Sequence, residues 1–287
     1  MDVGDNRIGK EQALNLVSIF KQKDQMKLVG LASCNLGVDG AKAVADYVSV
    51  SGLLTAINVG YNGIDQPSAR LILDAMKGKN MQSIGMARCS LGVEEAKILA
   101  EYVSIMGSLT AVDLSGNQEG DEGMRLIGEA LLASTSSKLT SLKCTKLDLK
   151  ADTISLALRN KGLGPGAAVL LSAAISKFMG SLTSLSVAYN SIVGDGAQQL
   201  ASAVLAKPNL EHFSGIALRE LRADSLTTLD LSGKGLGPPE AIVLADLLRS
   251  VSGSLTSLDV TYNQLGEEGR AMVSDAVKGR ESFTLKL

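Results

Sequence analysis

The stretch Leu109-Thr-Ala-Val-Asp-Leu-Ser-Gly-Asn117 decides the fold of this chain, because its pattern recurs along nearly the whole sequence. A close copy is Leu255-Thr-Ser-Leu-Asp-Val-Thr-Tyr-Asn263. Counted from the first apolar residue, positions 1, 4, 6 and 11 are apolar and position 9 is usually Asn. The pattern begins at residues 26, 54, 81, 109, 139, 153, 182, 210, 226 and 255. Such a period predicts a solenoid of about ten stacked units.

Each full unit changes its apolar spacing midway. Its first six positions have the near-alternation of a short strand. After position 11, Gly40-Ala-x-x-Val-Ala-x-x-Val48 and Glu95-Ala-x-x-Leu-Ala-x-x-Val103 follow the period of a helix. Because strand and helix repeat without reversal, the sequence predicts a parallel β-sheet with helices along its other side. Helices are wider than strands, so stacking should bend the array, with strands on the concave face and helices on the convex face.

Position 9 is predicted to be structural. An Asn amide offers a donor and acceptors to the backbone of its own loop and of the adjacent unit. The residues concerned are Asn6, Asn62, Asn117, Asn190 and Asn263. Cys34 and Cys89 take this position in two units, where a small, buried thiol can act as a weak donor. The chain has three cysteines, an odd number without paired metal spacing, so we expect no metal site.

Units of the form L-x-x-L-x-L-x-x-N/C-x-L-G, followed by G-A-x-x-L-A-x-x-L helices, resemble the leucine-rich repeats of the ribonuclease-inhibitor type. The units also alternate as in that subfamily, since Cys34-Asn-Leu-Gly precedes Asn62 and Cys89-Ser-Leu-Gly precedes Asn117. The resemblance covers nearly the whole chain. It implies a cytosolic α/β horseshoe, a solenoid whose members mostly bind other proteins. We therefore expect residues 1–287 to form a single leucine-rich repeat domain with partial units at both ends.

Two units depart from the pattern. Residues 139–152 and 210–225 are too few for a strand and a full helix, so each unit is expected to lack a helix. The resulting gap on the convex side is either a local change of curvature or a docking notch. Neither end of the chain shows the polar capping repeat that solenoids usually need. The chain is therefore expected to be a segment of a longer protein or to associate end to end with other copies.

Candidate partner contacts follow from strand geometry. Positions 2, 3, 5, 7 and 8 should face the concave surface or its edge, and most hold Thr, Ser, Ala or Gly. The larger or charged exceptions are either solvated surface positions or partner contacts: Tyr61, Arg88, Asp113, Lys143, Arg159, Tyr189, Asp230, Asp259 and Tyr262. Lys143 and Arg159, on neighbouring strands with Tyr189 next in order, are expected to form a basic and aromatic patch. Asp230 and Asp259 hold position 5 of adjacent strands, where like charges destabilise unless solvated or matched by a cation.

Composition argues against several classes of function. A net charge of −2, from 28 basic and 30 acidic residues, gives no electrostatic footprint for nucleic acid or an anionic membrane. No apolar run reaches the roughly 18 residues that span a bilayer. His212 is the single histidine, and no nucleophile or substrate site is organised around it. We therefore expect no catalytic residue and no cofactor, and predict a non-enzymatic, cytoplasmic scaffold that binds a protein partner of unknown identity on its concave face.

Two other functions stay open. One family of GTPase-activating proteins uses this repeat type, but its members typically carry a strongly acidic tail, whereas this chain ends Lys278-Gly-Arg-Glu-Ser-Phe-Thr-Leu-Lys-Leu287. A GTP hydrolysis assay with candidate small GTPases would decide this alternative. The second alternative is that the chain is the sensor segment of a larger receptor or of a ubiquitin-ligase adaptor. The full-length gene would decide this alternative.

Overall fold

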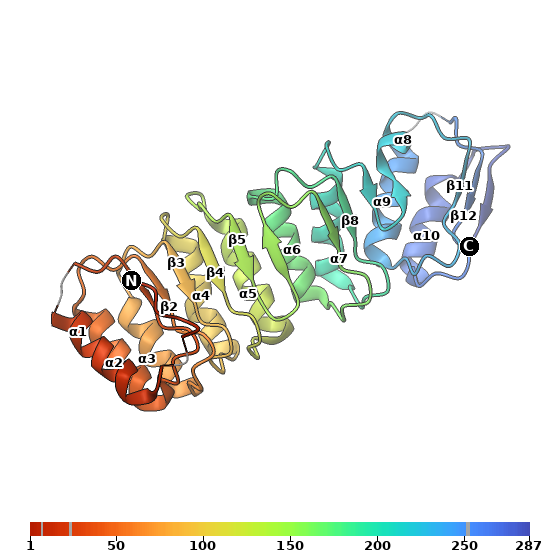
Figure 1. The fold of residues 1–287 in the computed structure, drawn as a ribbon. Helices are drawn as coiled ribbons and strands as arrows, with labels where there is room; N and C mark the ends of the chain where they lie inside the picture. Colours follow the sequence, from red (N-terminus) through yellow and green to blue (C-terminus); the bar gives the residue numbers. More distant parts are fainter. Residues whose placement is uncertain (7, 23–24, 251–252) are drawn as a thin grey trace. The chain divides into compact units, whose positions relative to one another are not determined.

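The computed structural model describes residues 1–287 except 7, 23–24 and 251–252. It divides into two compact halves, Met1–Lys150 and Ala151–Leu287, which we call the N-terminal and C-terminal halves. Short strands and helices alternate along the chain in both halves (Figure 1). The expectation that residues 1–287 form a single leucine-rich repeat domain stays a prediction.

In the described part of the N-terminal half, the strands form one sheet and stand side by side in chain order. Its strands are β1 (Leu28–Gly30), β2 (Ala56–Asn58), β3 (Ser83–Gly85), β4 (Ala111–Asp113), β5 (Ser141–Lys143) and β6 (Asp148–Lys150). Its helices are α1 (Lys10–Gln22), α2 (Gly37–Val50), α3 (Gln66–Met76), α4 (Val93–Ile105) and α5 (Gly120–Ala133). Strands β1 to β5 are parallel and pair equal positions of successive units, as Ile57 pairs with Ile84.

Among the described residues of the C-terminal half, the strands form two sheets, one of β7 to β10 and one of β11 to β13. The strands are β7 (Ser155–Ala157), β8 (Ser184–Ser186), β9 (His212–Phe213), β10 (Ile216–Ala217), β11 (Thr228–Asp230), β12 (Ser257–Asp259) and β13 (Thr284–Lys286). The helices are α6 (Pro165–Lys177), α7 (Gly194–Leu205), α8 (Leu218–Arg222), α9 (Pro238–Ser250) and α10 (Gly266–Ala276).

The predicted register is confirmed. Every predicted unit begins two residues before a strand, and positions 3 to 5 form that strand in all units but the one at 210, where β9 covers positions 3 and 4. Apolar positions 1, 4, 6 and 11 point into the core, as in the second unit, where Leu54, Ile57, Val59 and Ile64 are 3% exposed or less. The repeating α/β architecture inferred from the spacing is therefore the architecture of the chain.

Four of the five position-9 amides make the bonds expected of them, whereas the described hydrogen bonds of Asn6 go to the carbonyls of Val3 and Gly4 in its own turn. The buried Asn117 accepts hydrogen bonds from the backbone N–H groups of Cys89 (2.9 Å) and Leu91 (3.1 Å). Its amide nitrogen donates to the carbonyls of Met86 (2.8 Å) and Leu114 (2.7 Å). Each of these four amides thus satisfies backbone groups of two successive units, which would otherwise be buried without partners. Three other residues bond in the same manner: Asn62, Asn190 and Asn263.

The cysteines at position 9 act as weak donors, as predicted. Cys34 Sγ lies 3.4 Å from the carbonyl oxygen of Ala32, and Cys89 Sγ lies 3.6 Å from that of Ala87. Burial raises the pKa of the Cys89 thiol to about 12, which keeps it protonated at neutral pH. A reactive thiolate is therefore not formed at this position.

The two short units differ from expectation. Each forms an antiparallel hairpin, β5 with β6 and β9 with β10, so the prediction of strands that repeat without reversal is wrong there. The prediction of no helix in residues 210–225 is also wrong, because α8 adds one short turn. The second hairpin has a two-residue loop, Ser214-Gly215, with φ of 49° and 91°. Positive φ at both residues is what a tight hairpin loop requires.

Two buried glutamates of the described chain lie next to its short units, and Glu119 ties the first hairpin to the preceding unit. Glu119 accepts hydrogen bonds from the backbone N–H (2.7 Å) and hydroxyl (3.0 Å) of Thr145, in the β5–β6 loop. Glu240, in the first turn of α9, accepts one from the backbone N–H of Gly237 (2.9 Å). Burial raises the pKa of the Glu240 carboxyl, and hydrogen bonds from Ser214 and Gly237 partly oppose that rise.

Candidate functional site

Position 8, which carries four of the predicted contacts, lies in the left-handed backbone region. Its φ is 60° at Tyr61, 50° at Arg88, 58° at Tyr189 and 59° at Tyr262. The same position holds glycine in two units, Gly116 and Gly233. A non-glycine residue there costs about 1–2 kcal/mol, so the loop fixes these side chains at the end of the strands at some cost in stability.

In the N-terminal half, Tyr61 and Arg88 form an exposed ridge across successive units. The Arg88 guanidinium carbon lies 5.5 Å from the centre of the Tyr61 ring, which is 51% exposed. The stem of Arg88 extends over Gly116, where an added Cβ would lie 2.8 Å from Arg88 Cγ. We call these three positions the Tyr61–Arg88 ridge.

Asp113 and Lys143 lie beside each other on β4 and β5, where their Cα atoms are register partners. Asp113 Oδ1 accepts a hydrogen bond from the backbone N–H of Ser115 (2.9 Å). Lys143 also faces Asp148, its register partner on β6. With Gly85, which has no side chain, these residues line a shallow hollow of about 310 Å³ on the strand side. The surface next to the Tyr61–Arg88 ridge therefore carries charges of both signs.

In the C-terminal half, Tyr189 bridges two units that are not consecutive. Its backbone N–H donates to the carbonyl of Gly235 (2.8 Å) and its hydroxyl donates to that of Gly233 (2.8 Å). At Arg88, by contrast, the position-8 N–H bonds to the next unit, at Ser115. Tyr189 thus forms hydrogen bonds directly with the unit that follows the short unit 210–225.

Arg159 completes the environment of Tyr189, because its guanidinium carbon lies 4.1 Å from the ring centre. A guanidinium this close to an aromatic face is attracted by the negative charge of the ring face. Arg159 and Tyr189 are therefore adjacent, as the sequence predicts. The prediction that Lys143 and Arg159 lie on neighbouring strands is wrong, because the strand next to β5 is β6 and not a strand of the Arg159 unit. Lys143 belongs to the other half, so the patch that joins all three residues stays a prediction.

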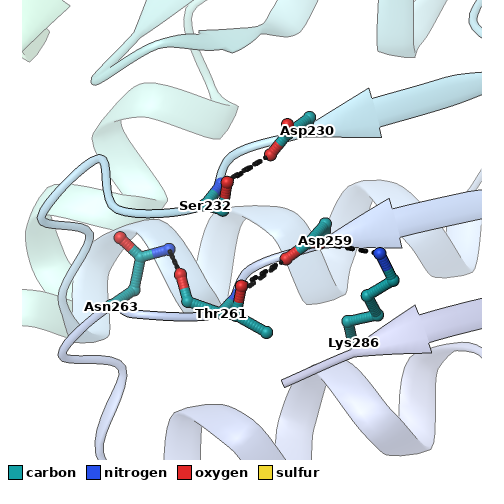
Figure 2. Close-up of polar contacts among 6 residues, drawn as sticks. All are labelled: Asp230, Ser232, Asp259, Thr261, Asn263 and Lys286. Carbon is teal, nitrogen blue, oxygen red and sulfur yellow. Dashed lines mark hydrogen bonds and ion pairs between the residues drawn. The ribbon is translucent and has the colours of Figure 1, made fainter.

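Asp230 and Asp259 are register partners on β11 and β12, and each bonds to the residue two positions onward (Figure 2). Asp259 Oδ1 accepts from the backbone N–H (3.0 Å) and hydroxyl (2.6 Å) of Thr261, and Asp230 bonds to Ser232 in the same way. These side-chain hydrogen bonds lower the pKa of both carboxyls. Lys286 of β13 lies 3.2 Å from Asp259, which supplies the cation that paired carboxylates need.

Sequence reasoning missed this second role of the aspartates and missed Lys286 as a partner. The signal was available in the recurring Asp-x-Ser/Thr pattern, since an Asp side chain readily bonds the backbone two residues onward. Tyr262, next to this cluster, is 90% exposed and makes no hydrogen bond or ring contact with any residue that the structure describes.

Two kinds of feature are absent from the described part of the chain. No three or more His, Cys, Asp or Glu side chains are gathered as metal ligands would be. None of the described helices combines the length and apolar character needed to cross a membrane.

Comparison with known proteins identifies the repeat. The family model described as "Leucine Rich repeat" matches residues 108–128 and 252–274. Mouse (Mus musculus) ribonuclease inhibitor is 25% identical over 275 residues, covering 94% of this chain and 53% of the inhibitor. Mouse NACHT, LRR and PYD domains-containing protein 14 is 25% identical over 290 residues, covering 100% of this chain and 26% of that protein. The solved leucine-rich repeat-containing protein LegL7 from Legionella pneumophila is 20% identical, with a TM-score of 0.28, covering 82% of this chain and 75% of that one.

The chain spans about half the length of mouse ribonuclease inhibitor and about a quarter of the other mouse relative. The two matched segments contain residues 109–117 and 255–263, the stretches that define the repeat. With the confirmed register and position-9 bonding, these similarities show that the chain is a leucine-rich repeat protein of the ribonuclease-inhibitor-like type.

Proposed function

We propose that this chain is a non-enzymatic, cytoplasmic scaffold that binds a protein partner through its strand side. Similarity to ribonuclease inhibitor, a protein named for its action on another protein, supports protein binding as the general role. Solenoids suit this role because stacked strands present an extended surface. The identity of the partner is not part of the proposal.

The observation that carries the proposal is the Tyr61–Arg88 ridge beside the charged strand surface of Asp113 and Lys143. Tyrosine and arginine are the residue types that most often dominate binding energy at protein interfaces. The left-handed loop holds both side chains in place before binding, which reduces the conformational entropy lost on association. Charges of both signs next to the ridge would fix the orientation of the partner.

The C-terminal half offers a second contact of the same kind. Tyr262 is fully presented to solvent although its left-handed backbone costs stability, and no described residue supports its side chain. A bulky residue at such a strained and exposed position is consistent with contact to a partner protein rather than with a role in stabilising this chain. Asp230 lies exposed in the adjacent unit, so a basic group of the partner would complement this end of the strand side.

A paired affinity capture from source-cell lysate tests the proposal. The strand-side variant carries Arg88→Glu, Lys143→Glu and Tyr262→Ala, none of which removes a hydrogen bond that the structure shows. We expect it to melt like wild type but to lose the retained partner, since two anchors and two positive charges are removed.

The matched control places the same change of charge on the helix side, with Lys42→Glu, Lys97→Glu and Leu71→Ala at exposed positions of α2, α4 and α3. Retention by wild type and control together, with loss by the strand-side variant, supports strand-side binding. Loss by the control with retention by the strand-side variant would refute it.

A second candidate is the sensor segment of a larger receptor. It is favoured by the similarity to a relative whose name places leucine-rich repeats beside NACHT and PYD domains and of which this chain covers 26%. The complete transcript would test it, because a receptor requires further coding sequence for an effector domain in the same reading frame.

A further inference from the structure

A hollow on the helix side of the C-terminal half is formed by three helices near their N-terminal ends. It measures about 490 Å³. Helix α7 and the residue before it contribute Val193, Asp195 and Gln198, and α9 contributes Pro238 and Ile242. The third side comes from the start of α10, at residues 265–269, and from Met272.

The hollow lies where α7 packs against α9, two helices that the short unit 210–225 separates in the sequence. On either side the helices approach closely: an added Cβ on Gly196 of α7 would lie 2.3 Å from the Pro165 carbonyl oxygen of α6. One on Gly269 of α10 would lie 2.8 Å from Ala241 Cβ of α9. Between α7 and α9 the chain supplies only α8, and Arg222 of α8 bonds the carbonyls of Val204, Pro208 and Leu210. Those bonds place α8 near the C-terminal end of α7, away from the hollow.

The lining has an apolar floor and an acidic rim. Val193, Ile242 and Met272 are exposed or half-buried apolar side chains within it. Asp195, Glu267 and Glu268 are exposed on the rim, and none of the three forms an ion pair with a residue that the structure describes. No Lys, Arg or His lines the described hollow.

Acidic residues in a first helical turn also favour the helix dipole, so their presence alone indicates no ligand. Elsewhere in the described chain, some first-turn acidic residues have basic partners, whereas Glu11 of α1 and Glu94 of α4 form no ion pair with a described residue. Asp39 of α2 lies 2.6 Å from Lys10, and Glu122 of α5 lies 2.6 Å from Arg125. At the hollow three such carboxylates converge on one apolar depression without a partner.

We propose that this hollow docks a short basic amphipathic segment of a protein partner. Apolar side chains of the segment would cover Val193, Ile242 and Met272, and its Lys or Arg residues would pair with the rim carboxylates. Charge complementarity is the argument for this occupant, because an acidic or neutral segment would leave three carboxylates unmatched beside buried apolar surface. This site lies on the helix side and is independent of the strand-side surface.

Fluorescence anisotropy with a labelled 14-residue peptide tests the proposal on the full chain. The peptide is built of Leu and Lys, with leucines at helical spacing, and a second peptide carries Glu in place of Lys. We expect the Lys peptide to bind wild type, with an affinity that falls as salt rises, and the Glu peptide not to bind. The variant Glu267→Lys with Glu268→Lys should weaken binding at least about tenfold, because it replaces attraction by repulsion at the rim.

The control variant Glu11→Lys with Glu94→Lys reverses two exposed first-turn glutamates on α1 and α4, with the same change in net charge. It should change the affinity by less than about twofold. The strand-side variant should bind the peptide like wild type, so this test and that of the proposed function can fail separately. Equal weakening by both double variants, equal binding of the Glu peptide, or no binding of the Lys peptide at about 1 mM would overturn the proposal.

Discussion

The substitution Gly235→Ala tests the bridge that Tyr189 makes over the short unit. Gly235 has a φ of 74°, and an added Cβ would lie 2.0 Å from a ring carbon of Tyr189. The left-handed backbone costs alanine about 1–2 kcal/mol. Displacing the ring would also break its hydrogen bond to the Gly233 carbonyl, worth about 0.5–1.5 kcal/mol, and its contact with Arg159, worth about 0.5–1 kcal/mol. We therefore expect a loss of about 2–4.5 kcal/mol in the free energy of unfolding.

Gly233→Ala is the matched control, because Gly233 has a similar φ of 62° but an added Cβ there would meet nothing within 4 Å. It should cost only the backbone strain, about 1–2 kcal/mol. Urea unfolding, followed by circular dichroism, measures the free energy lost in each glycine variant. Each variant is measured in the wild-type background and in the Tyr189→Ala background. Without the ring, the cost of Gly235→Ala should fall to that of Gly233→Ala. Equal cost of Gly235→Ala in the two backgrounds would refute the bridging role.

Three further predictions concern the core and its polar groups. Asn117→Ala should cost about 3 kcal/mol, because it leaves buried backbone groups unpaired. Asn6→Ala should cost less than about 1 kcal/mol, because Asn6 is exposed and its hydrogen bonds to described residues stay within its own turn. Urea unfolding compares the two variants, and equal losses would contradict the interpretation. Leu114→Asp should abolish the cooperative melt, since it places an unpaired charge in the core, and an unchanged melt followed by circular dichroism would contradict the register. The Glu240→Gln variant should gain stability relative to wild type as pH rises above about 4, the ordinary pKa of a glutamate. The folded-state pKa of Glu240 is raised, so the wild-type protein loses stability as pH rises from the ordinary pKa through the folded-state pKa. A neutral Gln has no such loss. Unfolding of both proteins across pH measures this, and a constant difference would be inconsistent with a buried titrating carboxyl.

The repeat architecture could be predicted from sequence because the apolar spacing and the residue at position 9 indicate the same strand. Apolar residues at positions 4 and 6 can be buried together only if the segment is a strand, and Asn117 or Cys89 at position 9 then reaches backbone groups of the neighbouring unit. The β5–β6 hairpin was missed, although Lys146-Leu-Asp-Leu-Lys150 alternates as a strand should. The expectation of uniform repeats concealed that signal.

The candidate site was only partly predictable. Strand spacing correctly placed Asp230 beside Asp259, because residues at equal positions of parallel units become register partners. The left-handed backbone at position 8 was signalled by Gly116 and Gly233, since glycine commonly marks positive φ. The bond from Tyr189 to Gly235 had no local signal, because it depends on which unit becomes adjacent once the short unit folds into a hairpin.

Site-specific photo-crosslinking in cells tests strand-side binding most directly. A photoreactive phenylalanine analogue would replace Tyr61 or Tyr262 on the strand side, and Leu71 or Ile105 on the helix side of the N-terminal half, all four being exposed. Strand-side binding predicts that one partner is crosslinked from Tyr61 or Tyr262 and from neither helix-side position. A partner crosslinked only from Leu71 or Ile105 would contradict it.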